Sequence, residues 1–221
     1  MTNIILWKNK FLKEKLISRT RNSMANSSKK NGLNKQKMSP SQNHKDYSFK
    51  ELNDDKKLKI KKLMETNIEV HVEIPYKSYV KYEFEDNKLM VDRVLATAMH
   101  YPGNYGYVPN TLADDGDAVD VLIINNAPFF PGSYVKCKVL GMLITEDEKG
   151  MDQKVIALPV SKIDRENDNI NDISDVNENT LAIIKDFFTN YKNNEPNKWV
   201  KCGDYKGAEE TIQFIKDKTL S

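Results

Sequence analysis

Alternating apolar and polar positions dominate the middle of the chain. In IEVHVEI at residues 68–74, valine and isoleucine alternate with polar or charged residues, which is typical of a half-buried strand. The short continuous apolar run VDVLII at 119–124 is instead typical of a strand that is buried on both faces. Together these patterns predict strands at 68–74, 79–85, 88–95, 119–124, 133–144 and 153–160.

A helical period appears only towards the C-terminus. Four apolar side chains fall on one stripe of segment 178–192, namely Leu181, Ile184, Phe188 and Tyr191. We predict a second helix over 207–218 and a short one over 51–66, which would lead into the domain. Strands followed by helices predict an α+β domain, in which a small β-barrel has helices packed outside it.

Charge separates the chain into a basic arm and an acidic body. Residues 1–50 hold twelve basic and two acidic residues, a net charge of +10, whereas residues 51–221 hold 22 basic and 30 acidic residues, a net charge of −8. Residues 22–45 are rich in Lys, Asn and Ser without an apolar period, and this composition predicts disorder. Residues 1–20 mix large apolar and basic side chains, as an organelle-targeting segment does, or they form a solvated extension without a role.

Several functional classes are disfavoured by the composition. Cys137 and Cys202 form no CxxC motif, so the sequence predicts a reducing compartment. No stretch approaches the ~18 apolar residues of a membrane-spanning helix. The arm carries no nucleic-acid motif. We therefore expect a cytoplasmic protein without nucleic-acid or membrane partners, with an organelle as the alternative if residues 1–20 target one.

The acidic loop DDGDAVD at residues 114–120 is the strongest candidate for chemistry. Asp115, Asp117 and Asp120 lie within six residues and directly precede an apolar run. A calcium loop of the EF-hand type fails, because it requires Gly at Asp120 and Glu at Asn126. The phosphatase pattern DxDx[TV] fits the letters, but its aspartate follows a buried strand, whereas here the strand comes afterwards. An isolated loop of this kind would be a solvated acidic turn.

Other charged residues in the sequence could form a site together with this loop. Glu73 and Glu83 lie on the polar faces of predicted strands, and Asp147, Glu148 and Asp152 lie near a later turn. Such an oxygen-rich set suits Mg²⁺, and the scarcity of His and Cys disfavours zinc. Lysines, an arginine and tyrosines occur among the same segments. Cationic and phenolic groups combined with Mg²⁺ are what binding of a dense anion such as a polyphosphate requires.

From about Ile68 to Phe214, the sequence resembles the soluble family I inorganic pyrophosphatases. The resemblance rests on an ordered series of blocks: VEIP, VKYEFE, VDRVLATAMHYPGNYGY, DGDAVDVL, DEKGMDQKVIALP and FFTNYKNNEPNKWV. One departure is Ala118, where the family usually has Pro, so that the loop is less pre-organised but loses no ligand. The basic arm lies outside the resemblance.

The resemblance implies an OB-like five-stranded barrel with flanking C-terminal helices, and hydrolysis of pyrophosphate to two phosphates with several Mg²⁺ ions. It also implies a homo-oligomer, either a hexamer, as the short core favours, or a dimer. Metal ligands would be Asp115, Asp120, Asp147, Asp152, Glu73 and Glu83. Substrate ligands would be Lys81, Arg93, Tyr105, Lys154, Tyr191 and Lys192. Asp117 would take the proton from the attacking water. A non-catalytic phosphate- or nucleic-acid-binding OB-like module is the alternative class, against which the acidic body argues.

Overall fold

The structure, a computed structural model, describes residues 67–220. The predictions for the arm 1–50, for its targeting segment and for a helix over 51–66 lie outside the described residues. Within residues 67–220, no helix is long and apolar enough to cross a membrane.

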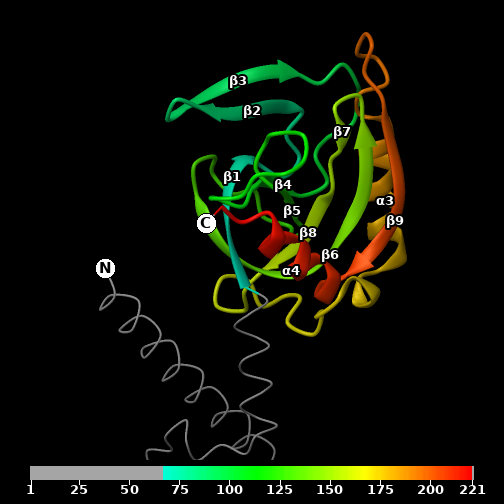
Figure 1. The fold of residues 1–221 in the computed structure, drawn as a ribbon. Coiled ribbons are helices and arrows are strands. Elements are labelled where there is room, and N and C mark those ends of the chain that lie inside the picture. The colour runs from blue at the N-terminus through cyan, green and yellow to red at the C-terminus, as the bar shows by residue number, and fades with distance from the viewer. Residues whose placement is uncertain (1–66, 221) are drawn as a thin grey trace, which may run out of the picture. The chain divides into compact units, whose positions relative to one another are not determined.

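The order of the elements agrees with the predicted series of strands followed by helices (Figure 1). The strands are β1 (Asn67–Ile74), β2 (Val80–Glu85), β3 (Lys88–Val94), β4 (Asn104–Tyr107), β5 (Asp120–Ile123), β6 (Tyr134–Asp147), β7 (Gly150–Met151), β8 (Lys154–Pro159) and β9 (Val200–Gly207). The helices are the 3₁₀ turn η3 (Ile173–Asp175), α3 (Glu178–Asn190) and α4 (Ala208–Asp217).

The series of paired strands in the main sheet starts at β1 and returns to β1. β1 pairs with β4, β4 with β5, β5 with β8 and β8 with β6, and β6 pairs with β1 again. All of these pairs are antiparallel except β5 with β8, which is parallel. The short β7 and the longer β9 extend the sheet from the far end of β6. This arrangement is consistent with the predicted OB-like barrel of five strands.

The main sheet separates two apolar cores. Val121 and Ile123 of β5 belong to one core, to which α4 contributes Ile215, whereas Leu122 belongs to the other core, against which α3 packs. Because neighbouring side chains of a strand point to opposite faces, a strand between two cores must be apolar at every position. This explains the unbroken apolar run after the acidic loop.

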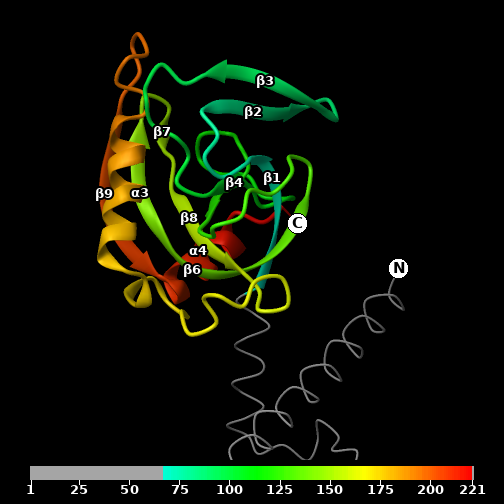
Figure 2. The same ribbon diagram turned by 180° about the vertical axis from the view of Figure 1, so that it is seen from behind.

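A separate sheet of two strands, β2 and β3, lies beside the main sheet (Figures 1 and 2). Its strands are antiparallel, and the register places Lys81 directly opposite Arg93. Cross-strand partners project from the same face of a sheet. The small sheet therefore presents two of the predicted substrate-binding cations side by side.

Two substantial strands, β4 and β9, were not predicted. The sequence NYGY of β4 has no apolar alternation that predicts a strand, but a Cβ atom on Gly106 would lie only 1.9 Å from the backbone oxygen of His71. Glycine is therefore required there by the close approach of β1. β9 reads VKCGDYKG, which lacks an apolar alternation. It is a strand because it pairs with β6, so tertiary context overrides local preference.

Candidate active site

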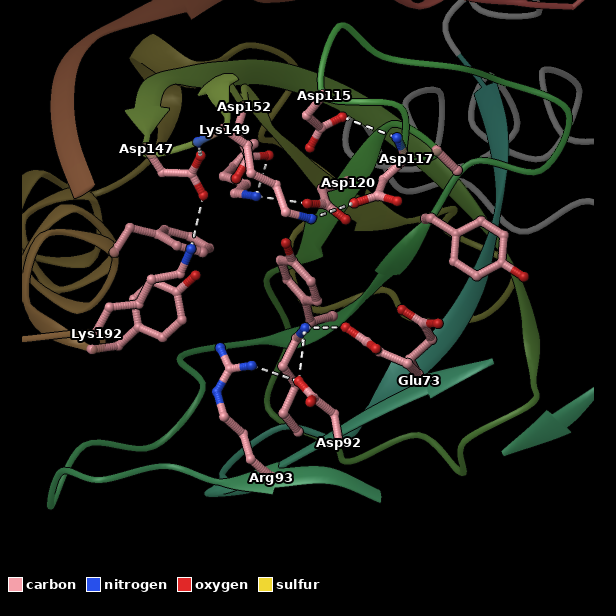
Figure 3. Close-up of a pocket in the computed structure, with 18 of the residues that line it drawn as sticks. Glu73, Asp92, Arg93, Asp115, Asp117, Asp120, Asp147, Lys149, Asp152 and Lys192 are labelled. Carbon is pink, nitrogen blue, oxygen red and sulfur yellow. Dashed lines mark hydrogen bonds and ion pairs between the residues drawn. The ribbon is translucent and has the colours of Figure 1, made fainter. Parts of the chain in front are cut away.

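A cavity of about 540 Å³ opens between the small sheet and the ends of the main-sheet strands (Figure 3). All thirteen residues to which the resemblance assigns a role line it. They are Glu73, Lys81, Glu83, Arg93, Tyr105, Asp115, Asp117, Asp120, Asp147, Asp152, Lys154, Tyr191 and Lys192. The structure therefore brings together side chains that lie up to 119 positions apart, from Glu73 to Lys192.

The acidic loop is held by its own backbone and by the strand that follows it. The amide N–H of Asp117 donates to a carboxylate oxygen of Asp115 at 3.1 Å, and Gly116 between them has a φ of +90°. That left-handed conformation suits glycine and strains other residues. β5 begins at Asp120 and is buried, so the position of this third carboxylate is fixed by the main sheet.

Lys154 is the buried cation at the centre of the site. Its Nζ atom donates to Asp120 Oδ2 at 2.6 Å and also to Asp152. Burial alone would lower the pKa of Lys154, but these two carboxylates outweigh that effect and raise it, so the ammonium stays charged. Burial raises the pKa of Asp152 to about 6, although Lys154 opposes this shift.

A second buried ion pair lies on the α3 side of the cavity. Lys192 follows the end of α3, and its Nζ donates to Asp147 Oδ2 at 2.8 Å. The backbone N–H of Lys149 donates to the other oxygen of Asp147, also at 2.8 Å. Burial raises the pKa of Asp147, but these two hydrogen bonds outweigh it and lower the pKa overall. Asp147 is therefore an ionised carboxylate at neutral pH.

The small sheet and β1 supply the opposite wall. Glu73 of β1 accepts a hydrogen bond of 2.9 Å from the backbone N–H of Phe84 in β2, which ties the two sheets together. Burial is the main reason that the pKa of Glu73 rises to about 7. Lys81 contacts both Glu83 and Asp92, the latter at 3.1 Å. Figure 3 shows Glu73, Asp92 and Arg93 across the cavity from the aspartates of the acidic loop.

Aromatic side chains, among them Tyr105, Tyr191 and Phe188, also line the cavity. Tyr105 and Tyr191 are buried, and burial raises the pKa of both phenols well above its ordinary value. They therefore stay protonated and can donate a hydrogen bond. The ammonium of Lys154 lies 5.8 Å from the centre of the Tyr105 ring and 6.0 Å from that of Phe188, within the range of cation–π attraction.

Comparisons with known proteins agree with this geometry. The family model described as inorganic pyrophosphatase matches residues 70–220. The chain belongs to the inorganic pyrophosphatase family. An inorganic pyrophosphatase of Nanoarchaeum equitans is 52% identical over 145 residues, which cover 66% of this chain and 91% of that protein. One of Campylobacter jejuni is 50% identical over 147 residues, covering 66% and 86%.

Solved structures of pyrophosphatases share the fold. The inorganic pyrophosphatase of Helicobacter pylori superimposes with a TM-score of 0.68 at 46% identity, covering 70% of this chain and 92% of that one. The Thermus thermophilus pyrophosphatase gives 0.67 at 38% identity, with coverages of 69% and 89%. Family membership confirms the predicted enzyme class, a hydrolase acting on pyrophosphate, over the alternative of a non-catalytic module.

The lining of the pyrophosphatase cavity has a net negative charge, which favours the binding of cations. Its lining contains ten Asp and Glu side chains and six Lys and Arg side chains, an excess of four carboxylates. In residues 67–220, no three His, Cys, Asp or Glu side chains are gathered so closely that they could already hold a metal ion. The residue types nevertheless fit a hard divalent cation, because carboxylate oxygens are its preferred ligands.

Some lining residues of the pyrophosphatase site were not assigned a role from the sequence. Lys149 lies 3.5 Å from Asp117, and Lys198 pairs with Glu148. Asp92 contacts Lys81 and Arg93. The sequence grouped Glu148 with Asp147 and Asp152 but gave it no role, and Lys149 is the next residue, so closeness to Asp147 in the chain was the available signal for both. No spacing or motif in the sequence marked Lys198 as a residue of the site.

Proposed function

We propose that this pyrophosphatase hydrolyses inorganic pyrophosphate to two phosphates in a Mg²⁺-dependent reaction within the described cavity. The single observation that carries the proposal is the excess of four carboxylates over basic groups in a cavity that must admit an anion. An anion of several negative charges is repelled by such a lining unless metal cations neutralise it. Pyrophosphate binding and divalent metal binding are therefore coupled.

The ligands proposed for Mg²⁺ are the carboxylates that the resemblance assigns. Asp115, Asp120 and Asp152 would hold the ions near the attacking water, and Asp147 would hold ions that arrive with the substrate. Glu73 and Glu83 would support this set. When bound, Mg²⁺ lowers the pKa of coordinated water and neutralises negative charge on the phosphoryl oxygens.

The substrate would be held from two sides. Lys81 and Arg93 reach it from the small sheet, and Lys154 and Lys192 reach it from the main sheet and the end of α3, with Tyr105 and Tyr191 as phenolic donors. Cationic groups on both sides stabilise the negative charge that develops on the attacked phosphoryl group and on the leaving phosphate.

Asp117 is proposed as the acceptor of the proton from water. Its side chain is 68% exposed and is paired only loosely with Lys149, at 3.5 Å. The oxygens of Asp117 are therefore accessible in the cavity that it lines, where a carboxylate within reach of the attacking water can act as its general base. The water oxygen would form a bond to one phosphorus, its proton would pass to Asp117, and the bridging phosphorus–oxygen bond would break to release phosphate.

A phosphate-release assay tests the proposed function. Purified full-length protein should release phosphate from pyrophosphate when Mg²⁺ is supplied, and should lose this activity in excess chelator. Nucleoside monophosphates should be hydrolysed hardly at all. Equal activity with and without chelator would refute the metal dependence. Salt-sensitive oligonucleotide binding without phosphate release would favour the non-catalytic module instead.

Assembly and compartment are separate proposals. The family resemblance supports a homo-oligomer, which light scattering of the purified protein would detect as a multiple of the 25.5 kDa chain mass. A cytoplasmic location is proposed, with an organelle as the alternative. A fluorescent reporter fused to residues 1–20 decides between these, because a targeting segment would move it out of the cytosol whereas a solvated extension would leave it diffuse.

A further inference from the structure

The cations proposed to bind substrate are mounted on two sheets that share no strand pairing. Lys81 and Arg93 belong to the β2–β3 sheet, whereas Lys154 belongs to the main sheet. A pyrophosphate ion held between them requires a fixed spacing across the cavity. Errors of about 1 Å in such spacing can cost roughly 10²-fold in rate. Some contact must therefore fix how the small sheet lies relative to the other wall.

The turn that follows α3, residues 192–198, makes such contacts in both directions. Lys192 binds Asp147 at the end of β6, and Glu195 binds Arg93 of β3, with 2.9 Å between Glu195 Oε1 and Arg93 Nε. The amide of Asn194 donates to the backbone oxygen of Ala96, just beyond β3, at 2.6 Å. One short turn is thus bonded to both walls of the cavity.

The turn itself is a compact unit. The backbone N–H of Glu195 donates to the carbonyl oxygen of Lys192 at 2.9 Å, and that of Lys198 donates to the carbonyl oxygen of Glu195 at 3.3 Å. Asn197 adopts a φ of +60°, and Pro196 limits the backbone further. The backbone positions from which the Glu195 and Lys192 side chains extend are therefore held relative to one another.

The bond to Glu195 also fixes the orientation of the Arg93 guanidinium. Glu195 engages Nε, and Asp92 engages Nη1, so two carboxylates define the plane of the group. A guanidinium has five N–H donors, and the remaining ones stay available to an anion in the cavity that Arg93 lines. The Glu195 side chain is only 13% exposed, which limits the competition from water.

We propose that Glu195 is a positioning residue for pyrophosphate hydrolysis: it orients Arg93 towards the substrate and couples the β2–β3 sheet to the Lys192–Asp147 pair. This inference rests on the proposed role of Arg93 as a substrate ligand. Glu195 does not itself contact the substrate, because its carboxylate is engaged with the guanidinium and would repel an anion.

Kinetics of Glu195→Gln test the proposal. Glutamine keeps the size of the side chain and a hydrogen-bond acceptor but removes the charge, so the spacing of the sheets is kept while Arg93 is oriented less strictly. We therefore expect an increase in KM for pyrophosphate of about 10-fold with a smaller change in kcat. Glu195→Ala should show a larger increase. The matched control is Glu210→Gln, which removes a carboxylate from the exposed ion pair between Lys206 of β9 and Glu210 of α4, and it should leave KM unchanged.

A double-mutant cycle with Arg93→Gln separates positioning from general damage to the fold. If Glu195 acts through Arg93, Glu195→Gln should have almost no further effect on KM once Arg93 is replaced. Fully additive effects would overturn the proposal, and so would an increase in KM that follows a loss of thermal stability. If the wild-type protein did not hydrolyse pyrophosphate, the proposed function would be refuted. If the wild type were active and Glu195→Gln had the same KM, only this inference would be refuted.

Discussion

The ammonium of Lys154 lies 2.6 Å from a carboxylate oxygen of Asp120, and only 4% of the lysine side chain is exposed. A buried charge of this kind is stabilised only while its partners are present. Asp120 and Asp152, both of which contact Lys154, are also proposed metal ligands. If these two carboxylates bind metal as proposed, the lysine and the metal would share them, and each would affect how the other is held.

Replacement of Lys154 by Met should destabilise the metal-free protein by at most about 3–5 kcal/mol, because it leaves the partly buried carboxylates of Asp120 and Asp152 without their cation. Added Mg²⁺ should recover more stability in this variant than in the wild type, since the metal can neutralise the same oxygens. Thermal unfolding with chelator and with Mg²⁺ measures both effects. Equal gains from Mg²⁺ in the two proteins would show that Lys154 and the metal do not share these carboxylates.

Asp117→Asn should lower kcat by about 10²-fold or more, as expected for loss of a general base. Thermal stability should change little, because Asp117 is largely exposed and its only described ion pair is the loose one with Lys149. Asp120→Asn should instead weaken Mg²⁺ binding, which isothermal titration calorimetry can measure. If Asp117→Asn had the larger effect on Mg²⁺ binding, the two assigned roles would have to be exchanged.

The metal-free protein should lose stability between about pH 4.5 and 7 because of Glu73. Burial raises the pKa of Glu73 from 4.5 to about 7, so in this interval the folded chain retains a proton that the unfolded chain has released. The stabilisation is therefore complete below pH 4.5 and disappears as the pH rises through 7. In chelator, the melting temperature of the wild type should fall across this range relative to that of Glu73→Gln. Parallel curves would contradict the raised pKa.

Calcium should inhibit turnover. Ca²⁺ binds oxygen ligands, but at about 2.3–2.6 Å rather than the roughly 2.0–2.1 Å of Mg²⁺, and it takes more ligands. The aspartates of the acidic loop are held by Gly116 and by β5, so they cannot readily adjust to the larger ion. Titration of Ca²⁺ into a Mg²⁺-saturated assay should suppress phosphate release, and extra Mg²⁺ should restore it. Comparable turnover with Ca²⁺ alone would argue against this account.

Much of the fold could be predicted from local patterns. Successive residues of a strand face opposite sides of the sheet, so their polarity follows the surroundings on each side. The alternation in β1 and the continuous apolar run before and within β5 led directly to those strands. β9 could not be found in this way, because its backbone is extended through pairing with β6 and its side chains carry no matching pattern. The same limit applies to β4, where a close backbone approach at Gly106 replaces side-chain packing.

The candidate site could likewise be predicted only in part. Its carboxylates and cations could be found because they occur in an ordered series of family-like blocks, and the structure brings them to one cavity, while their separate roles stay predictions. The contact between Glu195 and Arg93 could not be predicted, because it joins residues 102 positions apart in the chain. Nor could the pairing of Lys149 with Asp117, which depends on how two loops face each other.

The length of β6 has a consequence for how the protein reaches its folded state. This strand pairs at one end with β1, the first described strand, and at the other end with β9, the last one. Pairings between such distant parts of a chain form slowly, because the connecting segments must first be closed into loops. Asp147 lies at the end of β6 that β9 completes. We therefore expect substrate binding to be acquired late in refolding, because the end of β6 that carries Asp147 is paired on both sides only once β9 has joined the sheet.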